Sequence, residues 1–251
     1  MSQKNRDSLL IGIHSVESAL SRVPQQVRSV TVAQECRNPR VLELVEKARE
    51  AGIAVATEAR GVIDRRCEEQ RHQDVIADFD PANTGTEKDL DPLLKSIEGA
   101  PLVLILDGVQ DPHNFGACLR TAEAAGVDLV VVPKDRSVGL TPVARRSASG
   151  AAEVLPILFV TNLARVLRQL KDHGIWLAGT TDSSGQELHQ ADLSGPLGLV
   201  MGSEGKGMRR LTSELCDFHL RIPMQGSVSS LNVSVATGVC LYEALRQRAG
   251  K

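Results

Sequence analysis

Four largely apolar runs in the second half of the chain constrain its fold more than any other feature. They are PLVLIL at 101–106, VDLVVVP at 127–133, IWLAGT at 175–180 and LGLVMG at 197–202. Runs of this kind are typical of strands that are buried on both faces, as the strands of parallel sheets are. Helical patterns lie between them, so the sequence predicts an α/β fold with a parallel sheet that helices cover on both faces.

The leading part of the chain alternates in the same way, but in shorter elements. Helical patterns and strand patterns alternate over 14–22, 29–33, 39–51, 53–57, 62–69 and 74–79. Apolar periodicity that switches repeatedly between the two types indicates a small α/β unit. We therefore predict a separate domain at residues 1–79.

A linker is predicted between these two parts. Residues 80–100, DPANTGTEKDLDPLLKSIEGA, combine Pro, Asn, Thr and Gly with acidic side chains. Such a composition favours a flexible connection over a packed element. The predicted organisation is a domain at 1–79, an acidic flexible linker at 80–100 and a second domain at 101–251.

Charge and composition limit the classes of partner and site. With a net charge of −2 and only six aromatic residues, the chain offers neither a global field that attracts polyanions nor an extensive base-stacking platform. The pairs Arg145-Arg146 and Arg209-Arg210 can still contribute to a local basic patch. The five cysteines include no CxxC pair, which indicates free thiols in a reducing compartment and no metal site. No apolar run approaches the roughly 20 residues that a membrane span needs, so we expect a cytoplasmic protein.

The loop that follows the first apolar run carries several polar side chains. It reads DGVQDPHNFGACLR. Asp111-Pro112 is a turn pair, Asn114 can cap a helix, and the helix itself is predicted at 117–125. Arg120 lies in this helix, where it can either reach toward the loop or remain solvated.

The loop GSEGKGM at 202–208 follows the last apolar run. It is neither a Walker A sequence nor a GxGxxG dinucleotide fingerprint, which removes the commonest nucleotide-binding interpretations. Gly202, Gly205 and Gly207 would let a ligand approach the backbone closely. Glu204 among them can accept hydrogen bonds or act as a base, or it can simply be exposed. Since ligands of parallel sheets gather at the carboxyl ends of the strands, this loop is a candidate site.

A third polar loop, IPMQGSVSSLNVSVA, occupies residues 222–236 between Ile222 and a helical pattern that begins near Leu231. It presents Ser230, Asn232 and other small polar residues at a helix start, where backbone amides and the helix dipole favour an anionic or polar ligand. The alternative interpretation is an ordinary helix that Ser or Asn caps after a Gly turn.

Together, the three loops resemble the motifs of one enzyme family. LDGVQDPHNFGACLR (106–120), LVMGSEGKGMRRL (199–211) and IPMQGSVSSLNVSVATG (222–238) look like motifs one, two and three of the SPOUT-superfamily RNA 2′-O-ribose methyltransferases of the TrmH/SpoU family. The resemblance covers nearly all of residues 101–251. With the leading domain and GIHSV at 12–16, the chain is similar in particular to members that methylate a guanosine ribose in the peptidyl-transferase region of bacterial 23S rRNA.

The resemblance implies a catalytic SPOUT domain with a deep trefoil knot and an L30e-like leading domain that helps to hold RNA. It also implies S-adenosylmethionine as the methyl donor, 23S rRNA as the substrate and an obligate homodimer with the site at its interface. The cofactor would be held largely by backbone groups of Gly202, Ile222 and Leu231. The implied catalytic and substrate-positioning residues are Asn114, Arg120, Glu204, Ser230 and Asn232.

The family mechanism meets a physical difficulty at the motif-one arginine, which is proposed to activate the ribose hydroxyl. A guanidinium stays protonated in proteins, so Arg120 is a poor proton acceptor. We expect Arg120 instead to clamp an RNA phosphate and the developing alkoxide, with Glu204 or water as the proton acceptor. A departure occurs at 72–74, where HQD replaces the HQG that relatives commonly have, so that Asp74 brings a negative charge to a turn of the leading domain.

Three other functions fit part of the pattern. A tRNA ribose methyltransferase of the same family would share all three motifs. A non-catalytic RNA-binding protein on the same fold would be expected to lose Asn114, Arg120 or Glu204, and all three are present. A nicotinamide dehydrogenase would fit the α/β alternation, but the chain lacks the GxGxxG fingerprint of that class.

Overall fold

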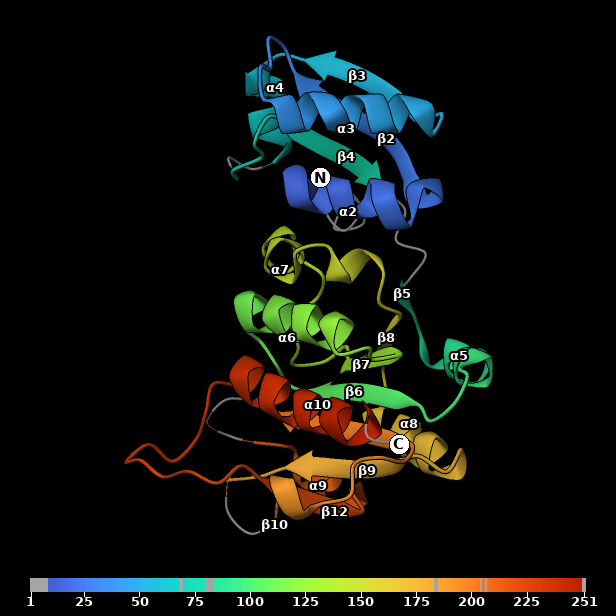
Figure 1. Ribbon diagram of the computed structural model, residues 1–251, viewed down its shortest axis with the longest axis vertical. Helices are drawn as coiled ribbons and strands as arrows, with labels where there is room; N and C mark the ends of the chain where they lie inside the picture. The colour runs from blue at the N-terminus through green and yellow to red at the C-terminus, as the bar shows by residue number, and fades with distance from the viewer. Residues whose placement is uncertain are drawn as a thin grey trace. The chain divides into compact units, whose positions relative to one another are not determined.

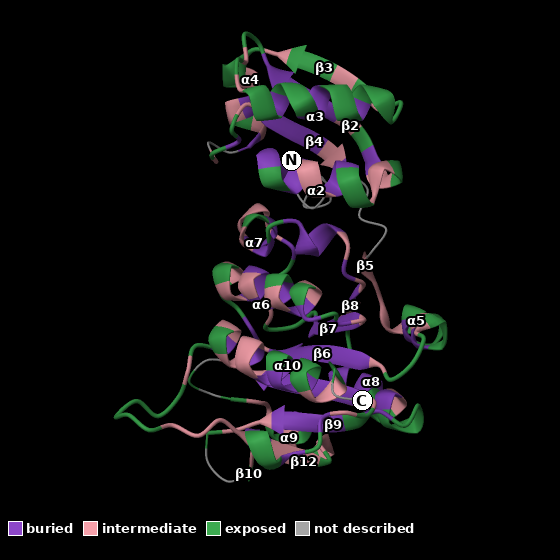
Figure 2. Ribbon diagram, in the orientation of Figure 1, coloured by how far each residue is buried: buried purple, intermediate pink, exposed green. Residues whose placement is uncertain are grey.

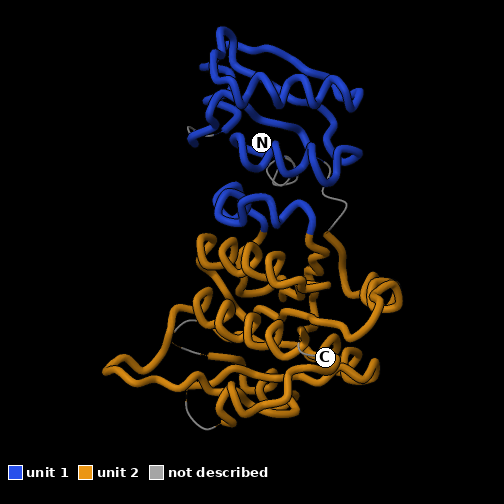
Figure 3. The backbone as a smooth tube through the Cα atoms, in the orientation of Figure 1, with its two compact units in different colours: residues 1–83, 140–154 blue, residues 84–139, 155–251 orange. Residues whose placement is uncertain are grey.

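The computed structural model describes residues 9–67, 70–79, 84–182, 185–203, 205 and 207–249. The chain divides into two compact units (Figure 3). Unit 1 comprises residues 1–83 and 140–154, and unit 2 comprises residues 84–139 and 155–251. A short segment from the second half of the sequence is thus grouped with the leading part of the chain.

Unit 1 is built on a four-stranded sheet in the described residues. Its strands are β1 (Leu9–Ile11), β2 (Val27–Ala33), β3 (Ala54–Glu58) and β4 (Val75–Phe79). Its helices are α2 (Ile13–Arg22), α3 (Pro39–Glu50), α4 (Arg60–Arg66) and α7 (Pro142–Ala148), with 3-10 turns η1 (Pro24–Gln26) and η3 (Ala151–Glu153). The strand order is β1-β4-β2-β3, with β2 and β3 parallel and the other neighbours antiparallel. The mixed α/β character predicted for the leading part of the chain is confirmed.

Helices α2 and α3 bury their apolar faces against this sheet. Val16 of α2 and Val41 of α3 belong to one buried cluster with Val30 and Phe79 of the sheet. Helix α3 begins where the Asn38 side chain accepts a hydrogen bond from the Arg40 amide at 3.1 Å. A polar N-cap followed by proline in the first turn is the sequence signature of such a start.

Unit 2 is built on an eight-stranded sheet whose neighbouring strands are all parallel in the described residues. The strand order is β10-β12-β9-β11-β6-β7-β8-β5. Its strands are β5 (Thr84–Gly85), β6 (Leu102–Asp107), β7 (Leu129–Pro133), β8 (Ile157–Val160), β9 (Trp176–Thr180), β10 (Gln186–Glu187), β11 (Leu197–Gly202) and β12 (Phe218–Arg221). Its helices and 3-10 turns are η2 (Glu87–Asp89), α5 (Leu90–Ser96), α6 (Pro112–Ala124), α8 (Leu163–Asp172), η4 (Leu188–Gln190), α9 (Arg210–Leu215) and α10 (Val233–Ala249). The predicted parallel sheet is confirmed.

The central strands are buried on both faces, as their continuous apolar sequences predict (Figure 2). Val103 and Ile105 of β6 pack in one cluster with α5 and α8. Leu104 and Leu106 are equally buried, and alternation along a strand directs them to the opposite face. Helix α10 lies beside α6 (Figure 1) and also contacts β11, within unit 2. Helices on both faces leave the strand ends as the accessible edges of the sheet.

The described part of the predicted linker contains secondary structure. Residues 84–96 form β5, η2 and α5, and β5 pairs with β8 at the end of the sheet. Thr86 and Asp89 form a capping box at η2, while Leu90 and Leu94 are buried in the cluster with α8. In these residues, the polar side chains that predict a flexible linker instead cap a turn, and the apolar side chains pack against unit 2.

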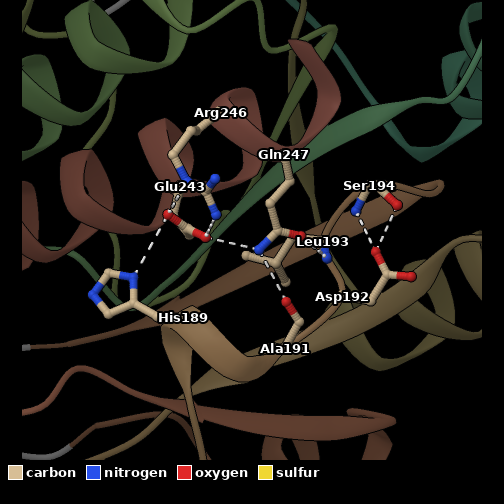
Figure 4. A network of polar contacts seen from close by, with 8 residues as sticks. All are labelled: His189, Ala191, Asp192, Leu193, Ser194, Glu243, Arg246 and Gln247. Atoms are coloured by element: carbon tan, nitrogen blue, oxygen red, sulfur yellow. Dashed lines mark hydrogen bonds and ion pairs between the residues drawn. The ribbon is translucent and has the colours of Figure 1, made fainter. Parts of the chain in front are cut away.

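The C-terminal half of α10 is fixed by a polar network (Figure 4). Glu243 receives hydrogen bonds from Arg246 at 2.8 and 3.0 Å and from Gln247 at 2.8 Å. Gln247 in turn donates to the Ala191 carbonyl at 3.0 Å and accepts from the Leu193 amide at 2.8 Å. Helix α10 is thus tied to the segment that precedes β11, which holds the helix in place over unit 2.

This network predicts a specific dependence of stability on pH. Hydrogen bonds from Arg246 and Gln247 lower the pKa of Glu243 to about 2. A carboxylate whose folded-state pKa is depressed stabilises the fold above its unfolded pKa of about 4.3, and this contribution is lost as the pH falls toward 2. We expect Glu243→Gln to reduce the fall in melting temperature between pH 5 and pH 2.5, as measured by circular dichroism.

The matched control is Glu46→Gln, since Glu46 forms an exposed pair with Arg49 at the same i,i+3 spacing and 2.8 Å. Exposed pairs contribute little to stability, so this variant should follow the wild-type pH profile. An equal change in both variants would show that the α10 network is not the source of the effect.

None of the helices in the described ranges has both the length and the apolar character that crossing a membrane requires. All five cysteines are free thiols, as predicted.

Candidate active site

Three loops meet at the carboxyl edge of the unit 2 sheet, after β6, β11 and β12. The Arg209 amide, beyond the loop after β11, donates to Asp107 Oδ2 at the end of β6 at 2.9 Å. Asn232 Nδ2, beyond the loop after β12, donates to Asn114 Oδ1 in α6 at 3.0 Å. Two hydrogen bonds between residues more than a hundred positions apart therefore join the three segments that the sequence singles out.

Asp107 anchors the first of these connections. It is 1% exposed, and its Oδ1 lies 3.1 Å from Arg209 Nε. The same guanidinium donates to the Asp135 carbonyl at 2.9 Å. A buried carboxylate must be paired to be tolerated, so the Asp107–Arg209 pair fixes the loop after β11 against the end of β6.

The loop after β11 closes in a tight turn. Ser203 and Gly207 exchange backbone hydrogen bonds of 3.0 and 2.9 Å. Gly202, just before the turn, lies so close to its far side that a Cβ there would be 2.3 Å from the Gly207 carbonyl carbon and the Met208 nitrogen. Only glycine allows two backbone segments to approach this closely.

Helix α6 begins five residues earlier than the sequence predicts, at Pro112 rather than 117. Its N-cap is Asp111, whose Oδ1 accepts hydrogen bonds from the amides of His113 and Asn114 at 2.7 and 2.9 Å. The expectation that Asn114 caps the helix is therefore wrong. An Asp-Pro pair that looks like a turn also serves as N-cap and first helical residue.

Asn232 does cap the last helix. Its Oδ1 accepts hydrogen bonds from the Ser234 amide at 3.0 Å and the Ser234 hydroxyl at 2.6 Å. The same side chain uses its Nδ2 to reach Asn114. The capping interpretation of the third loop and its participation in a site are therefore compatible, because the two ends of one amide serve the two purposes.

Two adjoining cavities open among these loops. The larger, of about 820 Å³, is lined by residues that follow β9, β11 and β12. The smaller, of about 510 Å³, is lined by residues that follow β6, β7 and β11. They share Ser203, Gly207, Met208 and Val233 as walls. A ligand in one cavity would therefore lie next to a ligand in the other.

Most of the predicted site residues line one of the two cavities. Gly202, Ile222, Ser230, Leu231 and Asn232 line the larger cavity, and Asn114 lines the smaller one.

The other two predicted site residues, Arg120 and Glu204, differ in what the structure describes of them. Arg120 is exposed on α6, lines neither cavity, and makes no hydrogen bond or ion pair with any residue in the described ranges. Glu204 lies outside the described residues.

Several cavity residues were not predicted. Thr180, Thr181 and Asp182, at and after the end of β9, line the larger cavity. Gln110 and Arg136 line the smaller one. The rule that ligands gather at the carboxyl ends of parallel strands points to the β9 residues as directly as it points to the loop after β11. No group of three or more His, Cys, Asp or Glu side chains in the described part of the chain is placed to hold a metal ion.

Two family models match the chain. The model described as the SpoU rRNA Methylase family matches residues 101–242, and the model described as RNA 2'-O ribose methyltransferase substrate binding matches residues 9–85. The 23S rRNA (guanosine-2'-O-)-methyltransferase RlmB of Pseudomonas syringae pv. tomato is 53% identical over 242 residues, which cover 96% of each protein.

Solved structures of methyltransferases resemble the chain over both of its units. The SpoU methyltransferase AviRb from Streptomyces viridochromogenes in complex with AdoMet has a TM-score of 0.78 at 26% identity, covering 97% of this chain and 91% of that one. The AdoMet-bound rRNA methyltransferase from Sinorhizobium meliloti has a TM-score of 0.79 at 25% identity, covering 98% and 90%. The family model that matches more than half of the chain, the relatives that match nearly all of it and these structures all indicate the same family. The chain belongs to the SpoU rRNA methylase family.

Proposed function

We propose that the chain is an S-adenosylmethionine-dependent methyltransferase that methylates the ribose 2′-hydroxyl of a guanosine in the peptidyl-transferase region of bacterial 23S rRNA. The observation that supports this most directly is the pair of adjoining cavities, one for a cofactor and one for a nucleotide, joined across the Asn232–Asn114 hydrogen bond. Relatives of near-identical length, at about half identity, carry the corresponding name.

The larger cavity fits the proposed cofactor. Its volume of about 820 Å³ lies within the range of roughly 300 to 1,000 Å³ in which small-molecule sites fall. Leu220, Ile222 and Leu231 give it apolar walls suited to an adenine ring, and Gly202 also lines it. When bound, S-adenosylmethionine supplies an electrophilic methyl group on a sulfonium. We propose that Gly202, Ile222 and Leu231 hold it largely through backbone groups.

The residues at the boundary of the cavities would position the ribose. Methyl transfer requires the 2′-hydroxyl to be in line with the methyl group and to lose its proton as the bond forms. Asn114 and Asn232 stand at this boundary on two different segments, and their amides are suited to orienting a hydroxyl. We propose that Ser230 assists them, and that Glu204 or water accepts the proton.

A homodimer with the site at its interface is part of the proposal. Helix α10 leaves Val235, Tyr242 and Leu245 exposed by 51%, 50% and 36%. These residues are seven and ten positions apart, so they lie on one face of the helix. Such an apolar stripe supports association through α10. Arg120 lines neither cavity of its own chain. In a homodimer it would instead clamp an RNA phosphate and the developing alkoxide at the site of the partner.

The remaining features implied by the resemblance stay proposals. We propose that residues 1–79 form an L30e-like domain that helps to hold RNA, that residues 101–251 form the SPOUT catalytic domain, and that its chain forms a deep trefoil knot. A cytoplasmic location follows from an rRNA substrate.

The test is transfer of labelled methyl groups from S-adenosylmethionine to unmodified 23S rRNA and, separately, to bulk tRNA. We expect incorporation into one guanosine ribose of the 23S rRNA. Asn232→Ser should reduce kcat/KM by about 100-fold, since misplacing a reacting group costs this much. Serine retains the N-cap of α10, so the melting temperature should stay close to that of the wild type.

Each other outcome has a definite meaning. Incorporation into tRNA alone would keep the chemistry and replace the substrate by that of a sister enzyme of the family. Binding of S-adenosylmethionine without transfer to either RNA would contradict the proposed activity. Full activity of Asn232→Ser would remove the boundary amides from the mechanism.

A further inference from the structure

The smaller cavity presents a hydrogen-bond acceptor and a donor that the proposed methyl transfer does not use. Asp111, after β6, and Arg136, after β7, both line it. Neither forms an ion pair in the described residues, in contrast to Asp107 and Arg209, which also line the cavity and pair with each other. One residue with an acidic side chain and one with a basic side chain thus line a single cavity of about 510 Å³.

The loops that carry the two groups are held in place. The Val138 amide donates to the Val109 carbonyl at 3.0 Å, which ties the loop after β7 to the loop after β6. Arg209 donates to the Asp135 carbonyl from the other side. Arg136 itself has a φ of +61°, an unusual conformation for a residue with a side chain. The backbone on both sides of the cavity is therefore set before a ligand binds.

The carboxylate of Asp111 is oriented by the helix it caps. Its Oδ1 accepts hydrogen bonds from the two amides at the start of α6. Its Oδ2 accepts none in the described part of the chain. One oxygen thus fixes the side chain, and the other is available to accept hydrogen bonds from a ligand.

We propose that the smaller cavity holds the target base and that Asp111 and Arg136 select guanine. Asp111 accepts hydrogen bonds from the N1–H and the 2-amino group, and Arg136 donates to O6. The proposal rests on the proposed methyltransferase function and adds the residues that read the base. The cavity shares four lining residues with the proposed cofactor cavity, and its Asn114 accepts a hydrogen bond from Asn232 of that cavity. A base placed there would therefore put its ribose at the boundary of the two cavities.

The pairing edges of adenine and cytosine support this choice, and uracil, which shares the N–H and the adjacent carbonyl oxygen, lacks the 2-amino group of guanine. Adenine presents an acceptor at N1 where guanine presents a donor, so its lone pair would face a carboxylate. It also presents an amino group in place of O6, which would face a guanidinium. Cytosine likewise presents an acceptor and an amino group on its pairing edge. A carboxylate and a guanidinium in one cavity therefore match guanine and oppose both of these bases.

The test compares guanosine with inosine, which lacks only the 2-amino group. Fragments of 23S rRNA that span the peptidyl-transferase region would carry either nucleoside at the methylated position. We expect the wild type to prefer guanosine by about 10- to 100-fold in kcat/KM, as hydrogen-bonded base recognition usually discriminates. Asp111→Asn should lower transfer to guanosine and bring the ratio close to one. Asparagine retains the Oδ1 acceptor that caps α6, so the helix start is preserved.

Arg136→Gln provides the matched control for base recognition. Inosine and guanosine both have O6, so this variant should lower both rates and keep the preference for guanosine. The proposal is overturned if the wild type methylates both nucleosides equally, or if Asp111→Asn retains the wild-type ratio. Absence of transfer to the guanosine RNA by the wild type, with cofactor binding intact, would overturn the proposed function itself.

Discussion

Replacing Gly202 by alanine is expected to weaken the binding of S-adenosylmethionine by about 10- to 100-fold. The new Cβ would lie 2.3 Å from the Gly207 carbonyl carbon and the Met208 nitrogen. These are backbone atoms, so they cannot rotate away as the tip of a side chain can. Overpacking of this kind costs about 1–3 kcal/mol, and each 1.4 kcal/mol is tenfold in affinity. The turn that must move lines both cavities.

Isothermal titration calorimetry with S-adenosylmethionine measures this loss directly. Gly195→Ala is the matched control, because nothing lies within 4 Å of a Cβ at that position and its backbone is not left-handed. The control should bind with the wild-type Kd. If Gly202→Ala also binds with the wild-type Kd while its fold is intact, the turn at 203–207 does not shape the cofactor site.

The edge of the sheet where the cavities lie could be predicted from the sequence, because continuous apolar runs indicate strands that are buried on both faces. All six residues of β6 are buried, and the uninterrupted apolar run over the first five of them predicts this for those five. The loops after such strands share one edge of a parallel sheet. This reasoning brings Asn114 and Asn232 to one edge although they are 118 positions apart. It says nothing of the hydrogen bond between them, which depends on the strand order.

The burial of some other residues could not be predicted. The sequence pattern reports only local structure, whereas the burial of these residues depends on tertiary packing. Arg145-Arg146 looks like part of a basic surface, yet Arg145 is only 2% exposed. Helix α7 is seven residues long, too short for apolar periodicity to separate a buried face from an exposed one. The same limit applies to residues 84–96, where a polar segment contains buried Leu90 and Leu94.

Replacing the buried Arg145 by methionine is expected to destabilise unit 1 by about 3–5 kcal/mol at neutral pH, since it leaves an uncompensated buried charge. Arg145 Nη1 lies 3.1 Å from Glu153 Oε1, and the two side chains are 2% and 0% exposed. The guanidinium carbon also lies 5.9 Å from the centre of the Phe79 ring, at a distance where a cation is attracted to an aromatic face. Hydrogen exchange of the β2 and β4 amides reports the opening of unit 1, and Trp176 fluorescence follows unit 2 as the internal control.

The double variant Arg145→Met/Glu153→Leu separates the loss of a charge partner from the loss of packing. It should recover most of the stability, because apolar residues replace buried ion pairs at little cost.

The dependence on pH gives an independent check. Burial raises the pKa of Glu153 even beside Arg145, so the folded state binds this proton more tightly than the unfolded state does, and stability is lost as the pH rises through the raised pKa. Without Arg145 the carboxylate loses the partner that lowers its pKa, so Arg145→Met should be relatively more stable at pH 5 than at pH 8, and the double variant should lose that difference. A double variant as unstable as the single one would assign the effect to the packing of Arg145 against Phe79 rather than to the charge on Glu153.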